Sequence, residues 1–338
     1  MRFLILYPNS TPRESNAFGW FIEVGKKLGI DVLVGFFEDY DKLLEIDRLS
    51  DLHLDKLPDV VLMRGYDFPL SLYFEERGVR VVNTALAMAL SRNKVATGLL
   101  LENNGIAMPR TLFLGNVLLD RSISKDIYPE SLLGGNAIFV DAFSPNDDLS
   151  NTCFLYKNIS EYFASEIFVL KQISGSKGEN VYLIHNEHEL LSAVQECQRN
   201  VNRDELLNID MQELVRNHIL FQEYIENSCG KDVRVWVIGD EVVGSVLRHN
   251  EKSFKSNYAQ GGSADRFDLS QSGRDIAIKA AKVLGLDFAG VDLLFVGKDA
   301  EGQDLFTVCE VNGNAGFRTA SIVGIDKIPE KLLAYCSR

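Results

Sequence analysis

The chain has 338 residues, of which 46% are hydrophobic and 25% charged, a composition ordinary for a globular protein with room for two or three cores. Its formal net charge of −13 excludes a broad basic surface, so neither nucleic acid nor an anionic membrane is expected as a partner. The five cysteines form no CxxC pair and no apolar run approaches the roughly 18 residues that cross a bilayer, which favours a cytoplasmic protein over a disulfide-stapled, zinc-binding or membrane-spanning one.

The first 90 residues alternate between strand-like and helix-like patterns. Apolar runs at 3–7, 32–37, 60–63 and 79–82 are separated by segments with helical spacing. This alternation predicts a small parallel sheet of the doubly wound type. The loop after Tyr7 contains no GxGxxG, so NAD is not expected as the cofactor.

The middle of the chain contains a lysine inside a strand pattern. Residues 167–184 predict a strand, a loop and a second strand, with Lys171 on the same face as Val169 and Ile173. Such a lysine needs an anionic partner, because desolvating its ammonium group is costly. The loop at 174–179 offers backbone N–H groups that can close over phosphates, although an ordinary hairpin turn would have the same composition.

The segments around this strand are less informative. Helical patterns cover residues 84–104 and 186–217, and Lys94 in the first of them would by itself be a solvated charge. Glycine, proline and a cluster of Asn, Asp and Ser interrupt residues 112–166, which predicts an inserted ribbon or lid.

A strand at 219–225 precedes a hairpin formed by 233–238 and 242–247. Pairing Ile238 with Val242 sets Asp232 opposite Arg248, and Arg234 opposite Val246. The three charges then share one face, either as a structural ion pair at the end of the hairpin or as an excess of positive charge beside phosphates. A polar loop at 254–262 and a helical pattern at 270–284 follow.

A second hairpin, formed by 291–296 and 305–311, gives the strongest chemical signal. If Asp292 lies opposite Glu310, alternation predicts one shared face for Asp292, Leu294, Val296, Phe306, Val308, Glu310 and Asn312. Two carboxylates and an amide then meet at one end of the hairpin. The two carboxylates would repel each other unless a cation lies between them. Oxygen ligands in that number suit Mg²⁺, whereas the alternative is a solvated hairpin end.

The order of these motifs resembles the ATP-grasp superfamily, and most closely the RimK-like carboxylate–amine ligases of the alpha-L-glutamate type. The motifs are a lysine before a helix, a lysine in a strand before a glycine loop, and then QEYI, DVR, FKSN, AGVD and EVN. The resemblance covers about residues 80–335. It implies a mixed α/β and α+β fold: an N-terminal Rossmann-like pre-ATP-grasp domain at 1–90, a central ATP-grasp subdomain with the glycine loop at 91–205, and a C-terminal subdomain with the metal site at 206–338.

The resemblance also implies ATP as the nucleotide and Mg²⁺ as the metal, with two ions and with Mn²⁺ able to substitute. The metal ligands that it implies are Asp292, Glu310 and Asn312. The implied nucleotide-binding residues are Lys94, Lys171, Ser176, Gly178, Gln222, Glu223, Tyr224, Ile225, Asp232, Lys255, Ser256 and Asn257. Arg234 and Arg248 match arginines near the transferred phosphoryl group, and Arg318 is a candidate to bind a substrate carboxylate.

The function that follows from the resemblance is an Mg²⁺–ATP-dependent ligase. It would join a small-molecule or peptide carboxylate to an amine, such as an amino acid like glutamate, through an acyl phosphate. A homo-oligomer is also implied. The alternatives are a nucleotide-binding regulatory or interaction protein without turnover, and a carboxylate kinase that stops at the acyl phosphate. Two departures, Asn312-Gly in place of Asn-Pro-Gly and the long segment 112–166, leave the acid and the amine unidentified.

Overall fold

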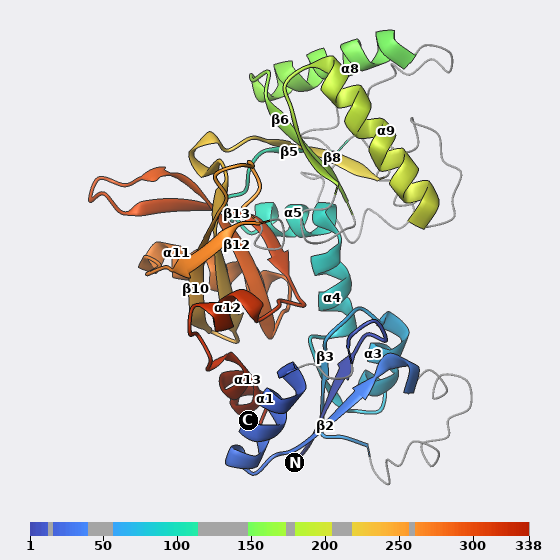
Figure 1. Cartoon of the computed structure of the whole chain (residues 1–338), viewed down its shortest axis with the longest axis vertical. Helices are drawn as coiled ribbons and strands as arrows, with labels where there is room; N and C mark the ends of the chain where they lie inside the picture. The colour runs from blue at the N-terminus through green and yellow to red at the C-terminus, as the bar shows by residue number, and fades with distance from the viewer. Residues whose placement is uncertain are drawn as a thin grey trace.

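The computed structural model describes residues 1–12, 16–39, 57–113, 148–173, 180–204, 218–256 and 261–337 (Figure 1). Their strands form three sheets, arranged along the long axis of the molecule. The two ends of the chain lie close together at one end of this axis, and the sheet that contains β5, β6 and β8 lies at the other (Figure 1). No helix among these residues combines the length and the apolar character needed to cross a bilayer.

The N-terminal sheet confirms the expected strands and their parallel pairing. Its order is β2-β1-β3-β4, and the strands are β1 (Arg2–Tyr7), β2 (Asp31–Phe36), β3 (Val60–Met63) and β4 (Arg80–Val82). The helices α1 (Asn16–Leu28) and α3 (Phe68–Glu75) and the short turn η1 (Phe37–Asp39) accompany it. β1 and β3 are buried almost throughout, which explains their continuous apolar sequences.

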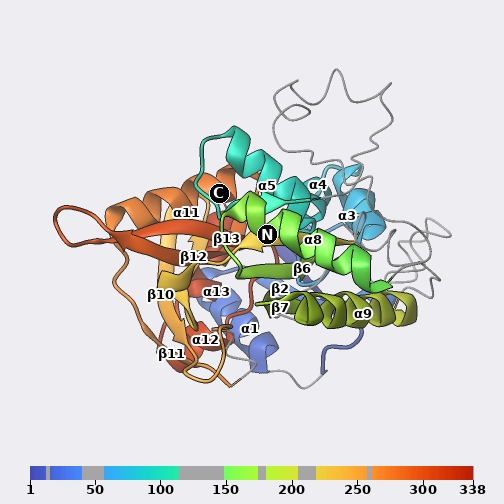
Figure 2. The same ribbon diagram turned by 90° about the horizontal axis from the view of Figure 1, so that it is seen from above.

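A four-stranded antiparallel sheet of order β5-β8-β6-β7 forms the upper unit in Figure 1. Its strands are β5 (Thr111–Leu112), β6 (Phe168–Gln172), β7 (Val181–Ile184) and β8 (Ile219–Glu223). Helices α8 (Asp148–Phe163) and α9 (Glu187–Asp204) run side by side across one face and share a core with Phe168, Leu170 and Phe221 (Figure 2). β8 therefore lies in this unit, although the predicted boundary at 205/206 would assign it to the C-terminal one.

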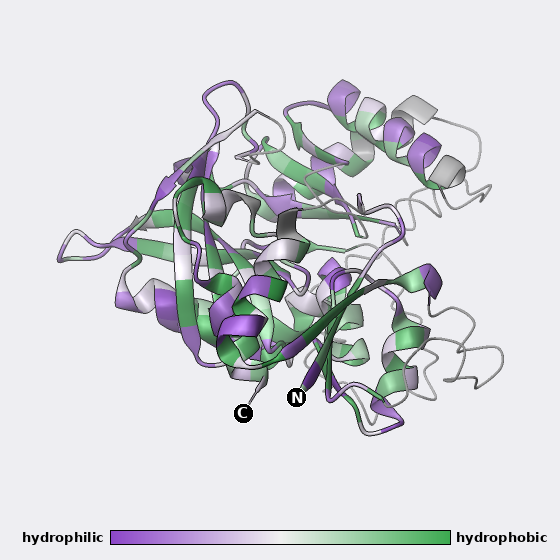
Figure 3. Ribbon diagram, turned by 60° about the horizontal axis from the view of Figure 1, so that its bottom comes forward, coloured by the Kyte–Doolittle hydropathy of each residue, from purple (hydrophilic) through white to green (hydrophobic). Residues whose placement is uncertain are grey.

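The C-terminal sheet is antiparallel throughout, in the order β11-β10-β9-β12-β13. Its strands are β9 (Lys231–Ile238), β10 (Glu241–His249), β11 (Ser263–Arg266), β12 (Phe288–Lys298) and β13 (Asp304–Asn312). The helix α11 (Gln271–Val283) packs on one face, against residues such as Val235. In Figure 3 much of this sheet is hydrophobic, while the hairpin loop that projects from it is hydrophilic.

The opposite face of the C-terminal sheet divides into two halves. Near one end, Trp236 and Phe288 join one core with Phe3 and Phe21 of the N-terminal unit. The helices α12 (Arg318–Ile322) and α13 (Ile328–Cys336) contribute to the same core. Further along the strands this face carries Asp232, Arg234 and Asp292 instead, so one alternating pattern supplies both a domain core and a polar site.

Both predicted hairpins form, but each contains a bulge. Asp292 lies opposite Glu310 as expected, whereas Leu293 pairs with Val308, so Cys309 is the extra residue. The prediction that Phe306 and Val308 share the face of Asp292 was therefore wrong: both are buried in the core beneath α11.

The predicted register of the hairpin formed by β9 and β10 was correct only away from its turn. Asp232 pairs with Arg248, and Arg234 with Val246, as predicted. Next to the turn, however, Ile238 pairs with Glu241 rather than with Val242. A register shift between Val242 and Gly244 restores the expected alignment at the charged end of the hairpin.

The hydrogen bond between Tyr335 of α13 and Asp287 is expected to give a pH-dependent contribution to stability. The Tyr335 hydroxyl donates to Asp287 Oδ1 at 2.6 Å, and burial followed by this hydrogen bond raises the pKa of Tyr335 to about 12. The folded protein therefore favours the protonated phenol, and this stability is complete below pH ~10 and lost as the pH rises towards about 12. Tyr335→Phe should lower the free energy of unfolding by about 1 kcal/mol at pH 8 in urea titrations, and by less at pH 11. An equal loss at both pH values would contradict this role.

Candidate active site

A cleft lies between the upper sheet and the polar half of the C-terminal sheet. Its volume is about 910 Å³ when the space open to solvent is included. One wall carries Val169 and Lys171 of β6, and the other carries Asp232, Asp292 and Glu310. The predicted site residues that line it are Lys94, Lys171, Gln222, Glu223, Tyr224, Ile225, Asp232, Lys255, Ser256, Asp292 and Glu310.

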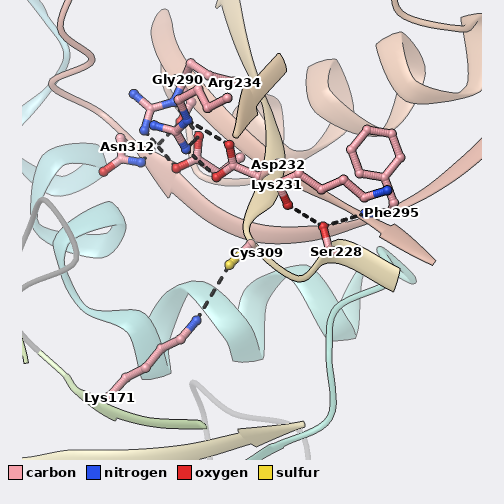
Figure 4. A network of polar contacts seen from close by, with 11 residues as sticks. Lys171, Ser228, Lys231, Asp232, Arg234, Gly290, Phe295, Cys309 and Asn312 are labelled. Carbon is pink, nitrogen blue, oxygen red and sulfur yellow. Dashed lines mark hydrogen bonds and ion pairs between the residues drawn. The ribbon is translucent and has the colours of Figure 1, made fainter. Parts of the chain in front are cut away.

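Two arginines and two aspartates form a buried network beside this cleft, whose lining includes the aspartates but neither Arg234 nor Arg248 (Figure 4). Arg234 binds Asp292 through two hydrogen bonds, from Nε to Oδ1 and from Nη2 to Oδ2, the latter at 2.7 Å. Arg248 Nε donates to Asp232 Oδ1 at 2.7 Å, and Arg248 Nη2 lies 3.0 Å from Asp292 Oδ1. The side chains are between 6% and 13% exposed, so each charge depends on its partners for compensation.

The network shifts the pKa values of Asp292 and Arg248. Burial by itself would raise the pKa of Asp292, but Arg234 and then Arg248 hold it below its ordinary value. Burial would lower the pKa of Arg248, whereas Asp292 and Asp232 raise it above its ordinary value. Arg248 is therefore charged, and the ion pairs hold both arginines in fixed orientations.

Gly290 provides the space that this arrangement needs. A Cβ atom added there would lie 2.7 Å from the Cβ of Ala315 and 3.2 Å from Arg234 Nη1. The glycine of the AGVD motif therefore allows the guanidinium of Arg234 to lie flat against β12 and reach Asp292.

The two predicted phosphate-binding lysines come together on the other side of the cleft. Lys94 is the first residue of α5 (Lys94–Asn103), and the side chain of Asn93 caps this helix by accepting from Val95 N and Ala96 N. Asn93 also separates α5 from α4 (Ala85–Arg92), which the sequence had predicted as one helical stretch.

Their surroundings leave both lysines facing the cleft. Lys171 Nζ lies 2.5 Å from Gln222 Oε1 and 3.6 Å from Cys309 Sγ. Burial lowers the pKa of Lys94, while the Glu310 carboxylate raises it in part and the charge of Lys171 lowers it again. Two cations packed this closely in one cleft are typical of a phosphate-binding site.

The three predicted metal ligands lie at the paired ends of β12 and β13. Asp292 pairs with Glu310, and Asn312 pairs with Gly290, with Asn312 Nδ2 3.5 Å from Gly290 O. The residues described here contain no cluster of three or more His, Cys, Asp or Glu suited to a metal. The predicted site has two carboxylates, and its third ligand, Asn312, is an amide. The donor set still fits Mg²⁺. A carboxylate has about four acceptor positions, and the two arginines account for three hydrogen bonds to Asp292.

The segment Gln222–Ile225 borders the cleft where β8 ends. Glu223 is fixed by Arg110, whose Nε lies 3.2 Å from Glu223 Oε2 and whose Nη2 donates to Phe163 O at 2.6 Å. Gln222 Nε2 donates to Thr111 Oγ1 at 3.0 Å, which orients its oxygen towards Lys171. These contacts hold both side chains in defined positions.

Some predicted residues fall outside the described part of the chain. These are Ser176 and Gly178 of the glycine loop and Asn257, together with the side chain of Arg318 and most of the predicted lid at 112–166.

Sequence reasoning missed Cys309 and Arg110. The extra residue of a bulge has no signature in an alternating pattern, and Arg110 acts across 113 residues of sequence.

Comparisons with known proteins show the family of this chain. The family described as RimK-like ATP-grasp domain matches residues 145–336. N-acetylaspartylglutamate synthase A of Mus musculus is 29% identical over 281 residues, covering 80% of this chain and 59% of that protein. The chain thus spans less than two thirds of that relative. A probable alpha-L-glutamate ligase of Cellvibrio japonicus (strain Ueda107) is 29% identical over 271 residues, covering 80% and 71%.

Solved structures show the same fold at lower identity. D-cycloserine synthetase DcsG has a TM-score of 0.61 at 13% identity, over 99% of both chains. D-alanine–D-alanine ligase from Bacillus anthracis, complexed with ATP, has a TM-score of 0.59 at 14% identity, over 100% of this chain and 96% of that one. These likenesses confirm the predicted ATP-grasp fold. Since the family match extends over more than half of the 338 residues, the chain belongs to the RimK-like ATP-grasp family.

Proposed function

We propose that this protein is an ATP- and Mg²⁺-dependent ligase that joins a carboxylate to an amine through an acyl phosphate. One observation carries the proposal: Lys94 and Lys171 face Asp292 and Glu310 across a single cleft. This arrangement places cations for phosphate oxygens opposite oxygen ligands for a metal. The relatives named as glutamate ligases and synthases support the same class of reaction.

The residues of the chain would divide the work by charge. Lys94 and Lys171 would bind phosphate oxygens, whose negative charge offsets the cost of burying an ammonium group. Gln222–Ile225 would border the adenine, and Asp232, Lys255 and Ser256 would contact the rest of the nucleotide. Asp292, Glu310 and Asn312 would hold Mg²⁺, which neutralises phosphate charge when bound.

Arg234 and Arg248 would stabilise charge on the phosphoryl group as it moves to the substrate carboxylate. Their ion pairs with Asp292 and Asp232 fix their orientation before the reaction, so no reorganisation is needed. Attack of the amine on the acyl phosphate then forms the amide and releases phosphate. No nucleophile from the protein is required.

The relatives suggest the substrates with which to begin. N-acetylaspartylglutamate synthase, β-citrylglutamate synthase and alpha-L-glutamate ligase all carry glutamate in their names. We therefore propose an amino acid of the glutamate type as the amine. The proposal also includes two metal ions, Mn²⁺ as a substitute, and a cytoplasmic homo-oligomer.

The test is an assay of ADP release by the purified protein. ADP should appear only when ATP, Mg²⁺, an acid such as N-acetyl-L-aspartate or citrate, and L-glutamate are all present. EDTA should stop the reaction, and excess Mg²⁺ or Mn²⁺ should restore it. Calorimetric ATP binding without turnover over a broad panel of acids and amines would contradict the ligase. Hydroxylamine trapping without any need for an amine would instead indicate a carboxylate kinase.

A further inference from the structure

A second polar cluster lies at the carboxyl edge of the N-terminal sheet, outside the nucleotide cleft. Tyr7 is the last residue of β1, and Arg64 directly follows β3, with its backbone N donating to Leu6 O at 2.7 Å. The strand order β2-β1-β3-β4 reverses direction between these two strands. Open α/β sheets bind ligands in the crevice at this switch point, beyond the carboxyl ends of the strands.

The side chain of Arg64 contacts the segment that follows the predicted metal ligands. Arg64 Nη2 donates to Ala315 O at 2.9 Å, and the guanidinium lies 4.6 Å from the ring centre of Phe317. Ala315 follows the predicted metal ligand Asn312 by three residues. The cluster is therefore next to the end of the cleft where the substrate carboxylate would react.

The polar groups of this cluster lack partners. Arg64 Nε and Nη1, Tyr7 Oη and Asn314 Oδ1 are buried and have no hydrogen-bond partner among the residues that the structure describes. Within those residues, no acidic side chain forms an ion pair with Arg64. A guanidinium has five N–H donors, and that of Arg64 donates one hydrogen bond, from Nη2 to Ala315 O. Buried donors left unpaired are costly, which is typical of a site completed by a ligand.

We propose that Arg64, assisted by the hydroxyl of Tyr7, binds the α-carboxylate of the amino acid that supplies the amine. This rests on the proposed ligase function and deepens it. Arg234 and Arg248 each use their Nε and Nη2 atoms to hold an aspartate in this same protein. The corresponding edge of Arg64 has an unpaired Nε, and its Nη2 donates one of its two N–H groups to Ala315 O. A carboxylate at this edge would accept from Nε and from the second N–H of Nη2.

Two further features fit an anionic ligand. The guanidinium packs against the aromatic rings of Phe317 and Phe288, with ring centres at 4.6 and 5.9 Å. The two unpaired nitrogens are buried, whereas the Arg64 residue as a whole is only partly buried.

The experiment compares Arg64→Gln and Arg64→Lys with the wild type in the ADP-release assay, with L-glutamate as the amine. Arg64→Gln should raise the KM for L-glutamate about tenfold to a hundredfold, with the KM for ATP unchanged, and Arg64→Lys should restore part of the loss. The wild type should prefer L-glutamate to γ-aminobutyrate, which lacks the α-carboxylate, and Arg64→Gln should lose this preference. The matched control is Arg77→Gln, whose guanidinium lies over the ring of Tyr73 in the same unit.

Unchanged KM and unchanged preference in Arg64→Gln, with an active wild type, would overturn the role of Arg64 and leave the ligase function standing. If the wild type releases no ADP with any acid, the ligase function fails instead. Calorimetric binding of L-glutamate to protein loaded with AMPPNP then decides the role of Arg64. Binding that Arg64→Gln abolishes supports it, whereas equal binding in both proteins, or none to the wild type, overturns it.

Discussion

Asp292→Asn is expected to abolish ADP release and to lower the free energy of unfolding by about 3–5 kcal/mol. The carboxylate is a proposed metal ligand and is also the shared partner of Arg234 and Arg248 in a buried network. An amide cannot compensate two guanidinium charges, so the variant leaves positive charge buried without a partner. Urea unfolding followed by circular dichroism would measure the loss of stability.

Glu310→Gln is the matched control for this variant. Glu310 pairs with Asp292 across the hairpin but forms no ion pair with the described residues, and it is only partly buried. Its substitution should remove ADP release while changing stability by less than about 1 kcal/mol. Normal turnover in either variant would contradict the metal assignment. Equal destabilisation in both variants would contradict the role of Asp292 as the shared ion-pair partner of Arg234 and Arg248.

Lys171→Met is expected to lower kcat/KM for ATP by about a hundredfold to a thousandfold. Methionine keeps most of the length and apolar character of the side chain but removes the ammonium group, which lies 2.5 Å from Gln222 and faces the cleft. The loss should therefore come from phosphate binding and from the charge that develops during transfer. Calorimetry with ATP should also show weaker binding, by at least about tenfold.

Lys298→Met provides the control for the loss of one positive charge. Lys298 is exposed and pairs with Asp304 at 2.9 Å on the hairpin away from the cleft, so its substitution should leave ATP binding unchanged. Lys171→Arg should retain part of the activity, because it keeps the charge but changes the geometry of the donors. Wild-type affinity and rate in Lys171→Met would contradict the phosphate-binding role.

The sequence determined the elements and much of the local chemistry of this protein. The apolar runs of the N-terminal unit predicted its four strands, because fully buried parallel strands read as continuous hydrophobic segments. The register assumed for one C-terminal hairpin set Asp292 opposite Glu310, and the register assumed for the other set Asp232 opposite Arg248. Both pairs form in the structure.

Only the tertiary structure decided how these elements share their surfaces. The bulge at Cys309 moved Phe306 and Val308 to the core face, since one extra residue reverses the alternation beyond it. The binding of Asp292 by both arginines depends on strands β9, β10 and β12 lying side by side. Arg64, whose Nε and Nη1 have no hydrogen-bond partner among the described residues, contacts Ala315 and Phe317, about 250 residues away. No local sequence pattern encodes a contact over that separation.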